Sequence, residues 1–388
     1  LDLSATGQTW DGFGAMNDWG DSNYWTNQET DLLMKKMGLN IMRIRIPVDE
    51  SHWKNLVPGC KYAVDTYGAR ILASPWTMPA AMKDNGELNA KNASGALSHL
   101  KAECYEDYAR YLEKFAAFMK ESGAPLYAIS VQNEPDMDAS YEGCIWSPEQ
   151  LLSFVRDYGH LVTSARLAGG ETLRMDHKYY DSILNDATAC ANLDIVAGHL
   201  YGATPQTYAL AAEKGKPLWM TEHLMNDSWS ANTSHWEETL KMAMEINGCL
   251  EKGWNAYIWW YGRRYYSFLG DGEEGTSRNT ILQRGKAYAQ FSANIRPGDI
   301  HIGSSVSGAS DLYTSAFLGE DGHISLVLVN PGKNAYDGVK VKAEGRSITS
   351  ASASYTTESA SESLQVALSG GACTLNLPAS SVTTLVIP

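Results

Sequence analysis

Two glutamates stand at the ends of short apolar segments in the 388-residue chain. Glu134 follows residues 127–133 (YAISVQN), and Glu222 follows residues 217–221 (PLWMT). One carboxylate at a strand end is usually a helix cap or a partner for arginine, but two such residues are poorly explained by that role. Two carboxyl groups about 5 Å apart can hydrolyse a glycosidic bond with retention of configuration, because one protonates the leaving oxygen while the other attacks the anomeric carbon. Glu134 and Glu222 are therefore candidate catalytic residues.

Strand periodicity indicates where these two carboxylates point. Side chains alternate between the two faces of a strand, so Glu134 shares a face with Gln132. The same rule groups Glu222 with Leu218 and Met220. Both glutamates are predicted to face the mouth of one barrel, where the reacting groups of such folds lie.

Charged and aromatic residues near other predicted strand ends could tune and surround the carboxylates. Arg43 and Arg45 alternate with apolar residues, and a nearby guanidinium keeps a carboxylate ionised and nucleophilic; a structural ion pair elsewhere is the alternative for Arg45. His199 and Tyr201 share one face and could hold a nucleophilic glutamate by hydrogen bonds, although a single histidine is more often a core residue. Tryptophan rings at or beyond strand ends could stack on sugar faces; these are Trp76, Trp146, Trp259 and Trp260.

Short apolar segments alternate with helical patterns from residue 11 to residue 292. Such alternation is typical of parallel βαβ units. The predicted strands cover residues 12–16, 41–46, 70–75, 126–134, 167–171, 193–201, 217–222 and 256–261. Eight strands within a length close to the usual ~250 residues predict an α/β fold with a (β/α)8 TIM barrel over 11–292. Aromatic and apolar residues three and four apart predict an amphipathic helix over 105–115.

Brief alternating segments follow residue 292 and predict antiparallel strands. They include 302–306, 324–329, 339–341 and 383–387. We predict a side β-sandwich domain over 293–388, with the Ser- and Ala-rich stretch 350–363 as a loop between strands. Residues 1–10 are too few to stand alone and are predicted to add a strand to this domain.

Composition narrows the classes of partner. Lys plus Arg total 31 against 45 Asp plus Glu, and the net charge of −14 disfavours nucleic acid and anionic membrane surfaces. Trp and Tyr number 12 and 21 against 7 Phe, which suits ligands that combine apolar faces with hydroxyl groups, as sugars do. The six cysteines form no Cys-x-x-Cys pair, and no complete dinucleotide or nucleotide-binding motif occurs. We expect no metal, cofactor, membrane span or nucleic-acid partner, and we interpret the acidic stretch 271–274 as a solvated loop.

Several motifs together resemble glycoside hydrolase family 30, and most closely its subfamily 8 xylanases. The matching segments span nearly the whole chain: 10–17 (WDGFGAMN), 73–76 (ASPW), 127–136 (YAISVQNEPD), 198–202 (GHLYG), 218–222 (LWMTE), 259–261 (WWY) and 380–385 (SSVTTL). The resemblance implies retaining hydrolysis of β-1,4-xylan, with Glu134 as the acid/base and Glu222 as the nucleophile. It also implies that Asn133 contacts the sugar 2-hydroxyl. The residues that it places in the sugar-binding cleft are Trp76, Tyr201 and Trp260.

One departure from the subfamily pattern bears on the substrate. In the subfamily, a tyrosine-rich loop after the nucleophile and an arginine after strand eight grip the glucuronic acid branch of xylan. Residues 223–227 (HLMND) contain no tyrosine, although Arg264 stands where the gripping arginine would be. One guanidinium without neighbouring donors recognises a carboxylate weakly, so we expect a weakened or absent requirement for glucuronic acid.

These observations predict a secreted, monomeric endo-β-1,4-xylanase that acts on xylan or xylo-oligosaccharides. The chain opens without an initiator methionine, as expected of a processed product. Three alternatives stay open: a glucuronoxylan-specific xylanase, a β-glucanase or other β-glycosidase of the same clan, and a noncatalytic polysaccharide-binding protein.

Overall fold

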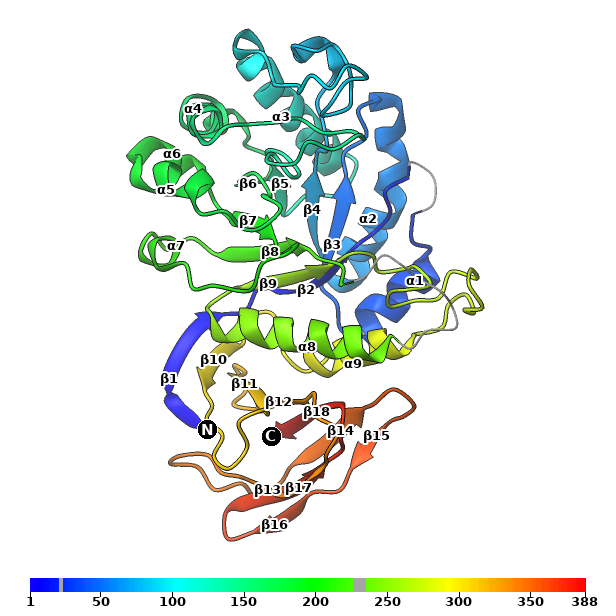
Figure 1. Cartoon of the computed structure of the whole chain (residues 1–388), viewed down its shortest axis with the longest axis vertical. Helices are drawn as coiled ribbons and strands as arrows, with labels where there is room; N and C mark the ends of the chain where they lie inside the picture. Colours follow the sequence, from blue (N-terminus) through cyan, green and yellow to red (C-terminus); the bar gives the residue numbers. More distant parts are fainter. Residues whose placement is uncertain (21–23, 226–234) are drawn as a thin grey trace.

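A computed structural model of the chain describes residues 1–20, 24–225 and 235–388. An eight-stranded parallel sheet with helices around it lies beside a smaller antiparallel unit, and both chain termini lie in that smaller unit (Figure 1). This arrangement confirms the predicted combination of a TIM barrel and a side β-domain.

The barrel sheet has the order β6-β5-β4-β3-β2-β9-β8-β7. Single parallel bridges, Ala168 with Ile195 and Thr172 with Gly198, join its two edges and close the barrel. The strands are β2 (Gly12–Met16), β3 (Ile41–Arg45), β4 (Arg70–Ser74), β5 (Ala128–Ser130), β6 (Arg166–Ala168), β7 (Val196–His199), β8 (Leu218–Glu222) and β9 (Ala256–Trp259). All eight fall within or next to the predicted ranges, and β5 is much shorter than predicted because residues 131–134 continue the pairing only through isolated contacts such as the bridge of Asn133 with Glu171.

Helices cover the outside of the barrel (Figure 1). They are α1 (Asn27–Asp31), α2 (Trp53–Tyr67), α3 (Tyr105–Glu121), α4 (Pro148–Tyr158), α5 (Lys178–Asn185), α6 (Ala187–Asn192), α7 (Ala209–Glu213), α8 (Trp236–Glu251) and α9 (Gln283–Ser292). The predicted amphipathic helix is confirmed as α3, whose buried stripe includes Tyr108, Leu112 and Phe115 at spacings of three and four residues. None of the helices described is both long and apolar enough to cross a membrane.

Two layers of apolar side chains hold the barrel together. An inner cluster takes residues such as Ile41, Leu72 and Trp219 from the strands, while a larger outer cluster joins the strands to the helices. Leu218 and Met220 belong to the outer cluster, so the prediction that they share a face with Glu222 is wrong. A register shift in the pairing of β7 with β8, between the Gly198 and His199 positions, turns Glu222 inward instead.

The side domain consists of two antiparallel sheets. The larger has the order β1-β10-β11-β12-β18-β14-β15 and the smaller β13-β17-β16. Their strands are β1 (Asp2–Thr9), β10 (Ile300–Gly303), β11 (Tyr313–Leu318), β12 (Ile324–Asn330), β13 (Tyr336–Val341), β14 (Ser352–Thr356), β15 (Ser361–Leu364), β16 (Ala367–Ser369), β17 (Ala372–Leu377) and β18 (Ser381–Ile387). The N-terminal strand β1 pairs with β10, as predicted. The predicted loop over 350–363 is wrong, because β14 and β15 form a hairpin there whose Ser and Ala side chains suit a sheet that packs against helices.

Helices α8 and α9 attach the side domain to the barrel (Figure 1). Buried polar contacts cross this junction: Asn247 of α8 donates to Ser315 Oγ at 2.5 Å, and Thr384 donates to the Gln290 carbonyl of α9 at 2.6 Å. A buried polar group that lost its partner would destabilise the fold, so these bonds specify how the two units pack.

Candidate active site

Glu134 and Glu222 lie together at the carboxyl ends of the barrel strands. A carboxylate oxygen of each and a ring nitrogen of His199 all lie within 4.8 Å of one another. Both glutamates are largely buried, 8% and 6% exposed, yet both line a cavity of about 780 Å³. Two carboxylates this close repel each other, so the protein must supply compensating positive charge and hydrogen-bond donors.

Glu222 receives two strong donors. Arg43 Nη1 lies 2.5 Å from Glu222 Oε2, and the Tyr201 hydroxyl donates to Glu222 Oε1 at 2.8 Å. The Arg43 guanidinium is itself fixed, because Nε donates to Ser74 Oγ at 3.0 Å and Nη2 to Asn133 Oδ1 at 2.6 Å. Arg43 is completely buried, so its charge is felt strongly at Glu222. These two donors fix the orientation of the Glu222 carboxylate.

Glu134 has different partners. His199 Nδ1 lies 3.2 Å from Glu134 Oε1, and the Tyr141 hydroxyl donates to Oε2 at 3.3 Å. The backbone of Glu134 is left-handed, with φ 46°, and its N–H donates to the Glu171 carbonyl at 2.9 Å. A left-handed glutamate costs about 1–3 kcal/mol, which is typical of residues whose side chains must be held at one point of a site.

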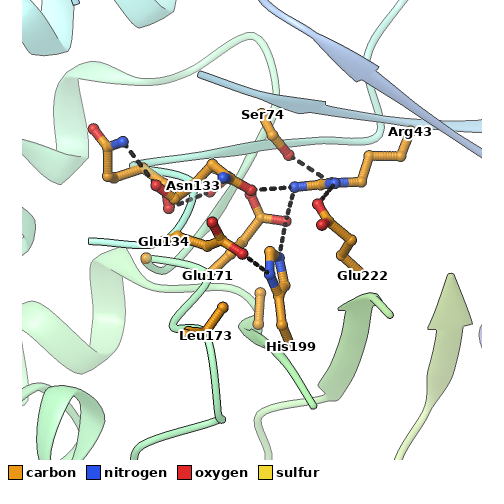
Figure 2. A network of polar contacts seen from close by, with 12 residues as sticks. Arg43, Ser74, Asn133, Glu134, Glu171, Leu173, His199 and Glu222 are labelled. Carbon is orange, nitrogen blue, oxygen red and sulfur yellow. Dashed lines mark hydrogen bonds and ion pairs between the residues drawn. The ribbon is translucent and has the colours of Figure 1, made fainter. Parts of the chain in front are cut away.

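Glu171 is a third carboxylate in this cluster, and it was not predicted from the sequence. It is fully buried between Arg43 Nη2, 3.1 Å from its Oε1, and His199 Nε2, 3.8 Å from the same atom (Figure 2). Burial alone would raise the pKa of Glu171. The charge of Arg43, with a smaller effect from His199, outweighs burial and lowers this pKa to about 2. Burial also opposes a charged imidazole, but Glu222, Glu134 and Glu171 raise the pKa of His199 to about 9. At neutral pH the cluster therefore contains a Glu171 carboxylate and a His199 imidazolium.

Aromatic side chains line the cavity around the two glutamates. Trp76, Tyr201 and Trp260 lie there as the sequence predicted, and the rings of Trp76 and Trp260 are 6.0 Å apart. Three further aromatic residues line the same cavity: Trp19, Tyr141 and Tyr266. They were not predicted, because they come from loops that carry no periodic pattern. Trp19 packs edge-on against Trp76 at 4.8 Å.

Two other predicted tryptophans do not reach the cavity. Trp146 packs among the helix-facing aromatics and donates to Gln132 Oε1 at 3.3 Å. Trp259 is fully buried and stacks on Phe268. The expectation that these two rings could meet a sugar is wrong: Trp146 packs against the helices, and Trp259 faces away from the cavity because Trp260, its neighbour in the chain, takes the inner side.

Arg264 and Arg45 lie outside this cluster. Arg264 Nη1 is 3.6 Å from Asp271 and 3.3 Å from Glu273, so the acidic stretch 271–274 acts as a counter-charge for this arginine. Arg45 pairs with Glu142 at 2.5 Å, which is the structural role left open for it. The loop that follows Glu222 is described only to Met225; the predicted difference at Asn226 and Asp227 lies outside the described residues.

Glu134, His199 and Glu222 also have the spacing of a metal-binding group. Both oxygens of Glu222 are already engaged, by Arg43 and Tyr201, and His199 is held between two carboxylates as an imidazolium. A metal ion requires a neutral imidazole and free carboxylate oxygens, so this donor set suits proton transfer better than metal binding.

The fold and the paired carboxylates at the barrel mouth define a glycoside hydrolase, and comparison with known proteins assigns its family. Residues 25–216 match the TIM-barrel domain of glycosyl hydrolase family 30, and residues 300–385 match the β-sandwich domain of that family. The chain belongs to glycosyl hydrolase family 30, as its motifs indicated.

Two kinds of relative resemble the whole chain. Glucuronoxylanase XynC from Bacillus subtilis is 34% identical, over 100% of this chain and 91% of that protein. The subfamily 8 xylanase Xyn30A from Clostridium acetobutylicum superposes with a TM-score of 0.88 at 30% identity, covering 100% of this chain and 98% of the other. A family 30 endoxylanase from Clostridium papyrosolvens gives a TM-score of 0.86, also at 30% identity and with 100% and 98% coverage.

Proposed function

We propose that the protein is a retaining endo-β-1,4-xylanase that works by double displacement and does not require glucuronic acid branches. The separation of the two carboxylates carries the proposal. Oxygens of Glu134 and Glu222 lie within 4.8 Å, near the ~5–5.5 Å of retaining glycosidases and well short of the ~6.5–9.5 Å that leaves room for a water in inverting ones.

In the first step Glu222 is the nucleophile and Glu134 the acid. The Glu222 carboxylate attacks the anomeric carbon, and the Glu134 carboxyl gives its proton to the leaving oxygen as the glycosidic bond breaks. Arg43 and Tyr201 aim the attacking carboxylate, while Asn133, held by Arg43, is the residue that the family resemblance assigns to the 2-hydroxyl of the same sugar. The products are a xylosyl ester on Glu222 and a free leaving-group sugar.

In the second step Glu134 is the base. Its carboxylate takes a proton from water, the resulting hydroxide attacks the anomeric carbon, and the ester bond to Glu222 breaks. Two inversions at one carbon give net retention. The His199 imidazolium, at 3.2 Å, stabilises the Glu134 carboxylate that exists between the two steps.

We propose xylan as the substrate because of the relatives. We propose that the enzyme also cuts xylan without glucuronic acid branches because of the surroundings of Arg264. The whole-length relatives include a glucuronoxylanase and xylanases, and the cavity here offers tryptophan and tyrosine faces for sugar rings. Arg264 is the residue that would hold a glucuronic acid carboxylate, but Asp271 and Glu273 already face it. A branch would have to displace them, so its binding adds little affinity.

Secretion and a monomeric state complete the proposal. Xylan is a polymer too large to cross a membrane, so an enzyme that cuts it internally must meet it outside the cell. All residues proposed for catalysis come from one chain, so the site needs no second copy.

A substrate panel tests the proposal. We expect reducing sugar release from unsubstituted xylan and from glucuronoxylan at similar rates, with short linear products from both. Cleavage only beside substituted sugars would favour a glucuronoxylan-specific enzyme. Activity on β-glucan in place of xylan would indicate a different β-glycosidase. Binding to xylan without any hydrolysis would indicate a polysaccharide-binding protein.

A further inference from the structure

Glu171 is a buried carboxylate for which double displacement by Glu134 and Glu222 assigns no step. It does not line the cavity, and it is 0% exposed. Its backbone is tied to the strand that carries the proposed acid, because its N–H donates to the Gln132 carbonyl at 2.8 Å and its carbonyl accepts from Glu134 at 2.9 Å. A buried charge is expensive, so a carboxylate kept there needs a reason other than packing.

Counting charges in the cluster gives one reason. Before reaction the proposed mechanism requires a protonated Glu134 and an ionised Glu222. With the Arg43 guanidinium, the His199 imidazolium and the Glu171 carboxylate, the two positive and two negative charges then cancel. Without Glu171 the same arrangement would hold one uncompensated positive charge in a water-poor site.

The first chemical step gives a second reason. When Glu222 becomes an ester its negative charge is lost, and a negative charge appears on Glu134 at the same moment. His199 Nδ1 lies 3.2 Å from that new carboxylate, while Arg43 keeps Glu171 at 3.1 Å as a counter-charge. The cluster is therefore neutral before and after the step.

We propose that Glu171 is a positioning residue that acts as the fixed counter-charge of the site, holding His199 protonated and oriented toward Glu134 and keeping Arg43 paired when Glu222 is esterified. The inference rests on the proposed double displacement. Glu171 touches neither substrate nor the reacting atoms; it acts through His199 and Arg43.

Other charged and titratable groups face this pair from the neighbouring strands and helices. Tyr201 donates to Glu222, and Tyr180 of α5 donates to the carbonyls of Gly170 and Ala197 beneath Glu171. The Asp136 carboxylate accepts from the Leu173 N–H at 2.9 Å, and desolvation of this carboxyl raises its pKa above the usual value. Of the carboxylates described, Glu171 is the one that contacts both Arg43 and His199.

The pH dependence of activity tests the inference. In Glu171→Gln, which keeps the shape of the side chain, both limbs of the kcat/KM profile on xylan should move to lower pH by about one unit, because loss of a nearby negative charge makes every proton of the cluster easier to lose. At a fixed pH on the alkaline limb, a shift of one unit lowers kcat/KM about tenfold, in addition to any loss of kcat/KM at the optimum pH. Glu171→Asp, which keeps the charge, should return the profile toward that of the wild type.

Glu142→Gln is the matched control, since Glu142 pairs with Arg45 outside the cluster and its loss should leave the positions of both limbs unchanged. An active Glu171→Gln enzyme with an unshifted profile would overturn the inference while leaving the proposed function intact. A wild-type enzyme that cuts no xylan would instead refute the proposed function. If Glu171→Gln does not fold, histidine NMR of the wild type decides: a His199 ring that is neutral at pH 7.5 overturns the inference, and a protonated ring supports it.

Discussion

Arg43 and Arg264 each face two carboxylates, but they lie in regions of opposite character. Arg43 is fully buried in the barrel mouth, 2.5 Å from Glu222 and 3.1 Å from Glu171. Arg264 follows β9, has a 40% exposed side chain, and lies 3.3 Å or more from its two acidic neighbours. Water screens the second group and is excluded from the first, so similar residue types interact with very different strength.

The comparison indicates that burial decides what an arginine does here. Arg43 organises a carboxylate, because no solvent competes for its guanidinium. Asp271 and Glu273 balance the charge of Arg264 without fixing a site around it, since an exposed ion pair contributes about 0–1 kcal/mol to stability and exchanges partners easily. Changes in the barrel mouth should therefore have large effects, and changes around Arg264 small ones.

The largest effect is expected for Glu222→Gln. The amide keeps the size of the side chain but cannot attack the anomeric carbon, so kcat on xylan should fall by at least about a thousandfold. Thermal unfolding should stay cooperative, because Arg43 retains Glu171 as a partner. Reducing sugar assays with a folded variant that keeps more than a few per cent of wild-type activity would contradict the assignment of Glu222 as nucleophile.

A stability measurement contrasts the two arginines directly. Arg43→Met leaves Glu222 and Glu171 buried without their cation, so the free energy of unfolding should fall by about 3–5 kcal/mol. Arg264→Met should change it by no more than about 1 kcal/mol. Urea denaturation of both variants at pH 7 gives the two values, and equal losses would remove the distinction between the regions.

The buried region should also respond to alkaline pH. Because the folded-state pKa of His199 is raised from its usual 6.5 to about 9, its contribution to stability is complete below pH 6.5 and is lost as pH rises toward 9. The loss should be on the order of 2–3 kcal/mol between pH 6 and pH 9.5. Urea denaturation at both pH values checks this, and in His199→Gln most of that difference should disappear. A difference that persists in the variant would place the titrating group elsewhere.

The sequence predicts the barrel well because its strands are apolar segments separated by helical patterns, a local signal. It also predicts that Glu134 and Glu222 meet at the barrel mouth, since both end apolar segments, and their catalytic roles stay a prediction. Glu171 ends the predicted strand 167–171 in the same way and could have been found by the same reasoning. Its partners could not, because Arg43 and His199 lie far from it in the chain.

Side-chain facing was predicted less well than strand position. Alternation fails at Glu222, because a register shift in the pairing of β7 with β8 interrupts the period. The same limit applies to Arg264, whose place after β9 was predicted while its pairing with the acidic stretch 271–274 was not. That pairing depends on how the loop folds back, and loop conformation leaves no periodic trace in a sequence.

The smallest effect concerns the partners of Arg264. In the double variant Asp271→Asn/Glu273→Gln the guanidinium loses both counter-charges and becomes available to a glucuronic acid carboxylate. The ratio of kcat/KM on glucuronoxylan to that on unsubstituted xylan should rise by up to about fivefold, the equivalent of about 1 kcal/mol for an exposed ion pair. Adding Arg264→Met should cancel the gain, since the preference depends on that cation. A ratio that stays at the wild-type value in the double variant would mean that Arg264 cannot reach the branch even when it is released, and the tolerance of missing branches would then follow from loop shape rather than from charge.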